Sequence, residues 1–163
     1  MGIHGQFVFY LPEHEPIIVP NTITDEGEQS FLKMIGRADV ADVAAAGNFY
    51  VGLCSEIPDD ADTLADIATE LGAAGSYARQ PISRDATGFP NLIAAAPAYK
   101  LQSLQVDFTA SGADFSTTFN RAFLCNVLSG TVGVLFAYSG ALPDPVQVVD
   151  GVTFPMRYEL FLR

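Results

Sequence analysis

The sequence predicts a mainly β protein: an antiparallel, jelly-roll-like β-sandwich with one or two short helices in its N-terminal half and an extended N-terminal arm. Three observations lead to this prediction. From Tyr77 onward, apolar residues alternate with polar ones in short runs separated by turn residues, which is typical of short antiparallel strands. Both helical patterns precede Tyr77, and three prolines interrupt the first twenty residues. We expect an arm over residues 1–20 and a single domain over residues 21–163.

The arm combines an apolar stretch with closely spaced prolines. Residues 6–11 (QFVFYL) suit one short strand, but Pro12, Pro16 and Pro20 follow and argue against any regular element. An extended apolar arm is suited to lying across a neighbouring subunit, and the alternative is that it packs on its own domain. The arm residues that we assign to such an interface are Phe7, Phe9, Tyr10, Leu11 and Ile17.

A helix is expected from about Asp25 to Ile35. Thr24 is a suitable N-cap, and acidic residues in the first turn favour the positive end of the helix dipole. Phe31, Leu32 and Ile35 are expected on one face. Gly36 is the expected stop, while Gly27 weakens the first turn.

A second helical pattern occupies residues 59–72. Leu64, Ile67, Ala68 and Leu71 recur at helical spacing, and Gly72 follows them. This pattern predicts a short amphipathic helix or an irregular helical turn, capped by one of the aspartates at positions 59 and 60.

The strands are expected on both sides of this helical segment. Residues 48–56 (NFYVGLCSE) predict a buried strand. Residues 77–83, 99–109, 113–128, 131–139 and 146–163 supply the later strands. Pro81 suits a strand end or an edge. Asp150 and Gly151 predict a hairpin turn before the alternating C-terminal run.

Composition excludes several classes of partner. The chain has 163 residues and a net charge of −11, from 19 acidic and eight basic residues. Nucleic-acid binding and adhesion to an anionic membrane both need clustered basic residues, so we expect neither. The N-terminal segment lacks the pattern of a signal peptide, and no apolar run approaches the length of a membrane span. Cys54 and Cys125 lie in apolar runs, so we expect them to be buried free thiols in a protein made in a reducing cytoplasm. The alternative is a single disulfide bond between them, which requires that they lie on neighbouring strands.

No arrangement of residues indicates catalysis, a cofactor or a metal. The histidines, His4 and His14, both lie in the expected arm, so neither a Ser-His-Asp nor a Cys-His site is expected. Zinc ligands at the usual spacing are missing. The aspartates at positions 59, 60, 62 and 66 lack the spacing of a calcium loop and indicate a solvated helix start. We therefore expect a protein that is not an enzyme.

The glycine-rich stretch from Leu71 to Asp85 (LGAAGSYARQPISRD) raises the question of phosphate binding. A phosphate loop needs a lysine after its glycines and must lead from a strand into a helix. This stretch has no such lysine and leads from a helix into a strand, so it is interpreted as a structural junction. Tyr77 is expected to anchor in the core or in a subunit contact. Arg79 and Arg84 are expected to pair with carboxylates, within the protein or across an interface.

Three motifs follow one another along the chain: Thr24, Glu26 and Gly27; Tyr50, Val51, Gly52 and Leu53; and Ser76, Tyr77, Ala78 and Arg79. Their order resembles that of a broad family of tailed-bacteriophage virion structural proteins. The resemblance spans about residues 21–163. Two departures are Ser76, where a glycine is common before the tyrosine, and residues 1–20, which have no counterpart in the family pattern.

The resemblance implies a component of a virus particle. The expected function is that of a capsid decoration (cement) protein, a homotrimer made in the host cytoplasm that binds the major capsid protein on the outer capsid surface. The acidic charge fits that surface better than the DNA-lined interior. The alternatives are a tail, baseplate or head-fibre-base protein, and a carbohydrate-binding or hydrolytic β-sandwich with an exposed platform drawn from Tyr99, Tyr138 and Tyr158.

Overall fold

The computed structural model describes residues 3–12, 14–37, 47–56, 58–95 and 98–162. These residues form ten β-strands, one α-helix and two short 3-10 turns. The elements in chain order are β1 (Ile3–Phe9), β2 (Ile17–Ile23), α1 (Asp25–Arg37), β3 (Asn48–Cys54), η1 (Leu64–Asp66), η2 (Ala74–Ser76), β4 (Gln80–Ser83), β5 (Asn91–Ala95), β6 (Ala98–Gln102), β7 (Val106–Thr109), β8 (Arg121–Cys125), β9 (Leu135–Ser139) and β10 (Thr153–Leu162).

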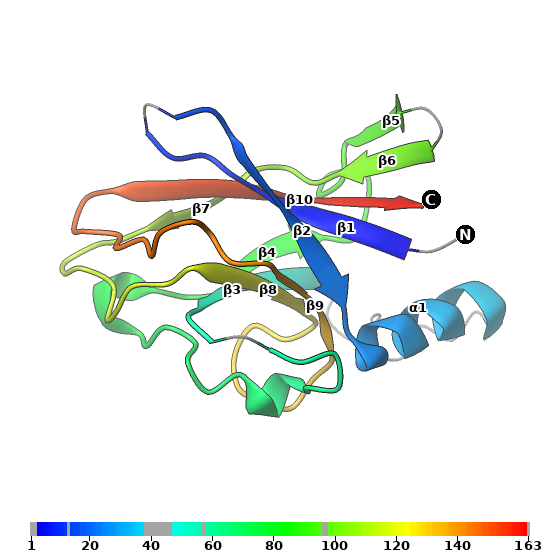
Figure 1. The fold of residues 1–163 in the computed structure, drawn as a ribbon, viewed down its shortest axis with the longest axis horizontal. Helices are drawn as coiled ribbons and strands as arrows, with labels where there is room; N and C mark the ends of the chain where they lie inside the picture. The colour runs from blue at the N-terminus through cyan, green and yellow to red at the C-terminus, as the bar shows by residue number, and fades with distance from the viewer. Residues whose placement is uncertain (1–2, 13, 38–46, 57, 96–97, 163) are drawn as a thin grey trace.

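The strands form one antiparallel sheet in the order β4-β3-β8-β9-β2-β1-β10-β6-β5, and β7 also pairs with β10. The sheet is curled into two facing halves, and β2 runs from one half into the other (Figure 1). The mainly β, antiparallel class is therefore confirmed. The finer expectation of a jelly-roll-like sandwich stays a prediction, because a single hydrogen-bonded path connects all the strands.

The expected N-terminal arm is not confirmed. β1 lies inside the sheet, paired with β2 on one side and with β10 on the other. Phe7 and Phe9 have no exposed surface, because they point from β1 into the core and contact Tyr158 and Phe154 respectively. Burying these aromatic rings within the domain is more favourable than leaving them on an extended segment.

Pro20 did not prevent the strand around it, although it lacks a backbone donor. β2 pairs with β1 through residues 17–20 and with β9 through residues 21–23. Pro20 therefore lies where the strand changes partners, which is a position at which a missing N–H is tolerated. The carbonyl of Pro20 still accepts a hydrogen bond from the N–H of Gly140 (2.9 Å).

α1 begins as predicted and packs against β9. The Thr24 hydroxyl accepts a hydrogen bond from the Gly27 N–H (3.1 Å), which confirms the cap. A side chain at Gly27 would collide with the backbone of Phe136 in β9, so the glycine allows close packing. Phe31 is buried against Phe136, whereas Leu32 is 67% exposed, contrary to the expectation that both lie on the buried face.

The other elements agree with the sequence pattern in part. β3 and the edge strand β4 lie where they were expected. The second helical pattern forms only the short turn η1, with Thr63 rather than an earlier aspartate as its cap. Leu64, Ile67 and Leu71 are nevertheless buried. The apolar spacing therefore identified residues of the core correctly, although they do not lie on one helix.

The Asp150-Gly151 pair forms a turn but not the predicted hairpin. The Val152 N–H donates to the Val149 carbonyl (3.0 Å), and Gly151 has a φ of 79° while Asp150 does not have a positive φ. This combination belongs to a type II turn, whereas a two-residue hairpin of type I′ needs a positive φ at both positions. β10 accordingly pairs with β1, β6 and β7 and not with the residues before the turn.

Candidate functional site

The junction from Leu71 to Asp85 is held in a conformation that leaves no phosphate cradle. Gly75 is buried with a φ of 64°, and a Cβ there would lie 2.6 Å from the Ala113 carbonyl oxygen. Ser76 also has a positive φ, of 63°. The backbone N–H of Ser111 donates to the Gly75 carbonyl (2.9 Å), which ties the turn to the loop after β7. The turn is therefore packed against the protein, as expected of a structural junction.

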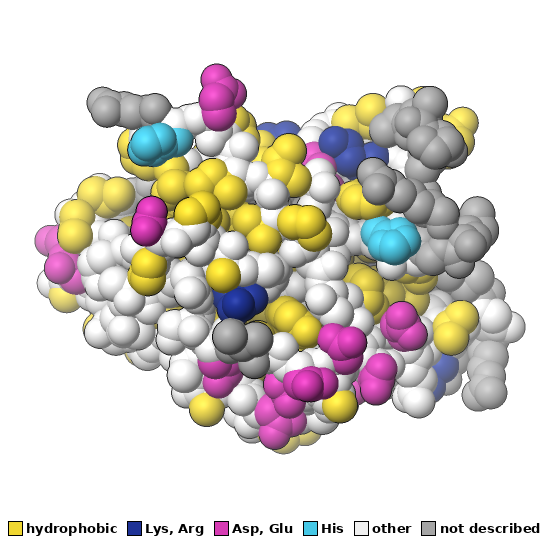
Figure 2. Space-filling view, in the orientation of Figure 1, with side chains coloured by type: hydrophobic (Ala, Val, Ile, Leu, Met, Phe, Trp, Pro, Cys, Tyr) yellow, Lys and Arg dark blue, Asp and Glu magenta, His cyan; other side chains and the backbone are white. Residues whose placement is uncertain are grey.

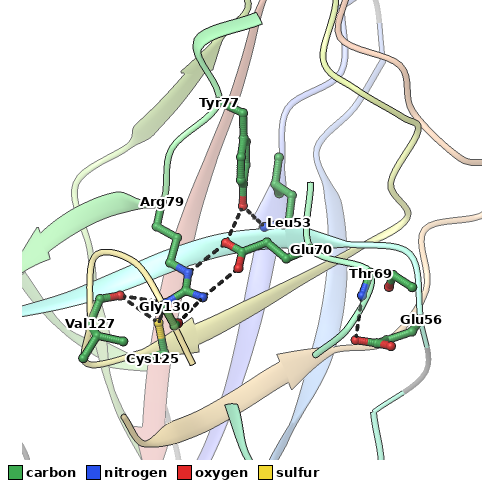
Figure 3. Close-up of polar contacts among 9 residues, drawn as sticks. All are labelled: Leu53, Glu56, Thr69, Glu70, Tyr77, Arg79, Cys125, Val127 and Gly130. Carbon is green, nitrogen blue, oxygen red and sulfur yellow. Dashed lines mark hydrogen bonds and ion pairs between the residues drawn. The ribbon is translucent and has the colours of Figure 1, made fainter. Parts of the chain in front are cut away.

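Arg79 is buried and paired within the protein, which is one of the two outcomes predicted for it. Its guanidinium donates to both carboxylate oxygens of Glu70, through Nε (2.8 Å) and one terminal nitrogen (2.6 Å). The terminal nitrogens also donate to the carbonyls of Val127 and Gly130, both at 3.0 Å (Figure 3). The guanidinium carbon lies 5.2 Å from the centre of the Phe123 ring. Arg79 thus ties its own segment before β4 to the segment that carries Glu70 and to the loop after β8. Only 4% of its surface is exposed.

Tyr77 belongs to the same cluster. Its hydroxyl accepts a hydrogen bond from the Leu53 N–H (2.8 Å) and donates to Glu70 (3.1 Å). Its ring stacks on Phe108 and meets Phe115 edge-on. Burial raises the pKa of Tyr77 above its ordinary value, and the negative charge of Glu70 adds to that rise. The hydroxyl is therefore a neutral anchor in the core.

The electrostatics of Arg79 agree with a fixed ion pair. Burial alone would lower the pKa of Arg79, but the hydrogen bonds to Glu70 raise it above its ordinary value. The guanidinium is always charged, so Glu70 has a permanent cationic partner. Every polar group in this cluster is engaged with another, and the cluster therefore has a structural role.

Both cysteines are free, buried thiols, and they do not form a bridge. They lie on the neighbouring strands β3 and β8, but Cys54 is opposite Arg121 and Cys125 is opposite Tyr50. Burial raises the pKa of Cys54 to about 12 and that of Cys125 to about 11. Since the thiolate is the reactive form, neither cysteine is a plausible nucleophile.

The acidic segment from Asp59 to Asp66 uses its carboxylates in local hydrogen bonds. Asp62 accepts from the Asp59 N–H (2.6 Å), and Asp66 accepts from the N–H and hydroxyl of Thr63. Asp60 accepts from the Tyr138 hydroxyl (2.9 Å). In the described part of the chain, no three histidine, cysteine or acidic side chains are grouped as metal ligands would be.

The strongest candidate for a functional surface is an apolar groove at the open end of the curled sheet. It lies between the β5–β6 hairpin, the end of β10 and α1 (Figure 1). Leu92 and Tyr99 are exposed on its wall, at 68% and 65% respectively. We use the name "apolar groove" for the surface made by Ile3, Phe31, Leu92, Tyr99, Leu101, Leu160 and Phe161.

The groove adjoins an open cavity of about 330 Å³ whose lining residues come from both halves of the sheet. Groove and cavity share Phe31, Leu101 and Leu160. Arg84 and Asp85 also line the cavity. The guanidinium of Arg84 lies 5.3 Å from the Phe49 ring centre, while Asp85 accepts hydrogen bonds from the backbone at Gly88 and Thr87. These hydrogen bonds lower the pKa of Asp85, so its side chain is a charged carboxylate held by the loop backbone.

The predicted interface residues do not form one surface. Phe7 and Phe9 are buried inside the chain, so this structure does not present them to a neighbouring subunit. Tyr77 and Arg79 are buried and hydrogen-bonded within the protein, which is the first of the two alternatives expected for each. Tyr10, Leu11 and Ile17 are half-buried around the β1–β2 connection. Leu11 and Ile17 line a separate pocket there, together with residues 14–15, 142–144 and 146. Arg84 is half-buried at the groove end of the molecule.

Sequence reasoning missed most of the groove. β5 was not predicted, and Tyr99 was considered as the start of a strand and as part of an aromatic platform, not as part of an apolar groove. The available signal was the uncharged run from Asn91 to Ala95, which precedes a second short β-type run ending at Gln102. A hairpin whose apolar residues stay exposed cannot be distinguished from a core hairpin by this pattern alone.

No family model matches the chain, and no curated protein matches its sequence. No helix in the described residues has the length and apolar character needed to cross a membrane.

Proposed function

We propose that this chain is a non-enzymatic structural protein of a tailed-bacteriophage virion. Its role is that of a capsid decoration (cement) protein, which binds the outer surface of the major capsid shell and stabilises that shell as an oligomer. The resemblance of the motifs at Thr24, Tyr50 and Tyr77 suggests the family and a homotrimeric state. The two facing halves of the sheet suit the jelly-roll-like sandwich that forms part of the same proposal.

The apolar groove is the observation that carries the proposal. A chain with a net charge of −11 is well solvated, yet it leaves Leu92 and Tyr99 largely exposed on one continuous apolar surface. Continuous exposed apolar surface marks contacts with other macromolecules. The polar clusters around Arg79 and Asp66, in contrast, are engaged in internal hydrogen bonds and offer no reacting pair. A contact surface without reactive groups supports a role in assembly.

Charge supports the outer surface as the location. Acidic side chains gather along the lower part of the face in Figure 2, near the start of α1 and the segment from Asp59 to Asp66. Packaged DNA would repel such a surface, whereas the outside of a shell leaves it in solvent.

Binding to capsid shells tests this proposal. Purified protein is mixed with shells of the matching phage that lack it, and the bound fraction is measured by co-sedimentation and located by cryo-electron microscopy. Tyr99→Asp places a charge in the apolar groove and is expected to weaken binding by at least about tenfold. Val132→Asp is the matched control, because Val132 is 91% exposed and lies outside the groove. The proposal fails if the unchanged protein does not bind the shells.

The alternative of a tail, baseplate or head-fibre-base protein predicts few copies per particle, whereas a decoration protein predicts hundreds. Quantitative gel analysis of particles distinguishes them. A carbohydrate-binding β-sandwich is favoured only by the exposed ring of Tyr99, since Tyr138 and Tyr158 are buried. Binding to a glycan array that is lost in Tyr99→Ala would support that alternative.

A further inference from the structure

β5 is an outermost strand of the sheet with one free side. Within the described residues it pairs with β6 alone, from Asn91 opposite Gln102 to Ala95 opposite Ala98. The backbone N–H and C=O groups on its other side therefore face none of the described strands. Such groups are a template for a further extended chain.

The two edges of the sheet differ in how they are protected. β4, at the other edge, has four residues and contains Pro81, which cannot donate a hydrogen bond to an added strand. β5 has five residues, Asn91 to Ala95, without a charge or a proline. Leu92 on one face and Ile93 on the other are 68% and 39% exposed, so neither face is covered. Edges without charge or proline are the ones that pair with other chains.

The charge distribution favours a second copy of this chain as the partner. Lys100, on β6 beside β5, is neutralised by Glu159, with their charged atoms 3.0 Å apart. The acidic segment around Asp59 lies along the lower side of the view, whereas the β5–β6 hairpin lies at its upper right (Figures 1 and 2). Two chains of net charge −11 can therefore meet at β5 without bringing their Asp59 segments together, whereas contact through those acidic segments would be repulsive.

We propose that two copies of this chain pair through β5, antiparallel and about a two-fold axis, so that their sheets become continuous. Antiparallel pairing of one strand with itself is self-complementary, as a two-fold interface requires. With the axis at Ile93, Leu92 lies opposite Ala94 of the partner subunit. The apolar grooves of the two copies then lie on the same side of the joined sheet, and their exposed leucines and tyrosines form one larger apolar surface.

This contact is independent of the proposed virion function and of the expected trimer. A two-fold contact joins copies in pairs, so it produces dimers or links one oligomer to another. Loss of this contact would leave binding to a capsid possible, and failure to bind a capsid would leave this contact intact.

Oligomeric state tests the proposal directly. Sedimentation and light scattering are measured from low to high micromolar concentration for the unchanged chain and for Ile93→Lys. The lysine pair created across the axis is expected to raise the dissociation constant of the paired state by about a hundredfold or more. Val132→Lys adds the same charge to another exposed valine and is expected to change nothing. A chain that stays monomeric, or an Ile93→Lys variant that associates as Val132→Lys does, overturns the proposal.

A crosslinking variant covers the case in which Ile93→Lys fails to fold. Residues opposite each other in an antiparallel pair have Cβ atoms about 5 Å apart, close to the separation that a disulfide spans. Ile93→Cys is therefore expected to form a covalent dimer under mild oxidation. The native thiols do not interfere because Cys54 and Cys125 are buried. Crosslinking no faster than that of Val132→Cys overturns the proposal.

Discussion

Replacing Arg79 with alanine is expected to destabilise the fold strongly, because this side chain joins regions that are distant in the sequence. The substitution removes both hydrogen bonds to Glu70 and the donors to the carbonyls of Val127 and Gly130. It also removes the contact with the Phe123 ring.

The magnitude follows from the burial of each partner. Removing one member of a buried ion pair costs about 3–5 kcal/mol, because the other charge is left without compensation. The side chain of Glu70 retains 22% exposure, so water can partly replace the guanidinium and the lower end of that range applies. We therefore expect Arg79→Ala to lower the free energy of unfolding by about 3 kcal/mol. For a chain of this size that corresponds to a fall in Tm of roughly 6–12 °C.

The assay is urea unfolding followed by circular dichroism, with the free energy extrapolated to water. Arg79→Lys keeps the charge but loses the two-pronged geometry, so about half of the loss is expected. Arg157→Ala is the control: Arg157 also lies over an aromatic ring, that of Tyr10 at 5.3 Å, and about 1 kcal/mol is expected.

A double-mutant cycle with Glu70→Ala decides whether the ion pair is responsible. The two losses should be non-additive by about 1–3 kcal/mol if Arg79 and Glu70 act as a unit. Additive losses, or an Arg79→Ala loss below about 0.5 kcal/mol, would refute the reasoning.

Three further predictions concern the junction, the thiols and acid stability. Ser76→Gly relieves a positive φ of 63° and is expected to raise stability by about 0.5–1 kcal/mol in the same urea assay; a loss would show that the serine contacts matter more. Cys54 and Cys125 have pKa values raised by burial to about 12 and 11, so a thiol reagent at pH 8 should label them only at the rate of unfolding, as followed by absorbance. Burial alone would raise the pKa of Glu159, but hydrogen bonds from its neighbours bring it below the ordinary value of 4.5. Its carboxylate therefore contributes stability that is present above that value and is lost as pH falls through the lowered pKa; Glu159→Gln should flatten this part of the curve of Tm against pH.

Local patterns in the sequence were sufficient for several elements. Thr24 and the apolar residues after it located the start of α1, and the run from Asn48 located β3, because caps and buried aromatic runs are decided by neighbouring residues. The ion-pair role of Arg79 also followed from the scarcity of cations. The identity of its partner, Glu70, could not be predicted from the sequence, because that contact depends on how the junction after Leu71 brings Arg79 back beside Glu70.

Long-range pairing was the part that local patterns did not predict. The first twenty residues contain the apolar run of a strand, but only the distant residues of β10 make that strand central. Pro20 was interpreted as a breaker because a change of pairing partner within one strand leaves no local mark. The groove was missed for the same reason: exposure of Leu92 and Tyr99 depends on how far the β5–β6 hairpin extends beyond the rest of the sheet.

The pairing of β1 with β10 also determines when the fold can form. Gln6 and Glu159, which are hydrogen-bonded across this ladder, are 153 residues apart. A ribosome therefore releases β1 long before β10 exists, and the middle of the sheet closes only after nearly all the described residues have been made. Contacts of such long range close slowly. During that interval the aromatic side chains of β1 have no ladder with β10 to bury them, so the timing of synthesis exposes this strand to misassociation more than any other part of the sheet core.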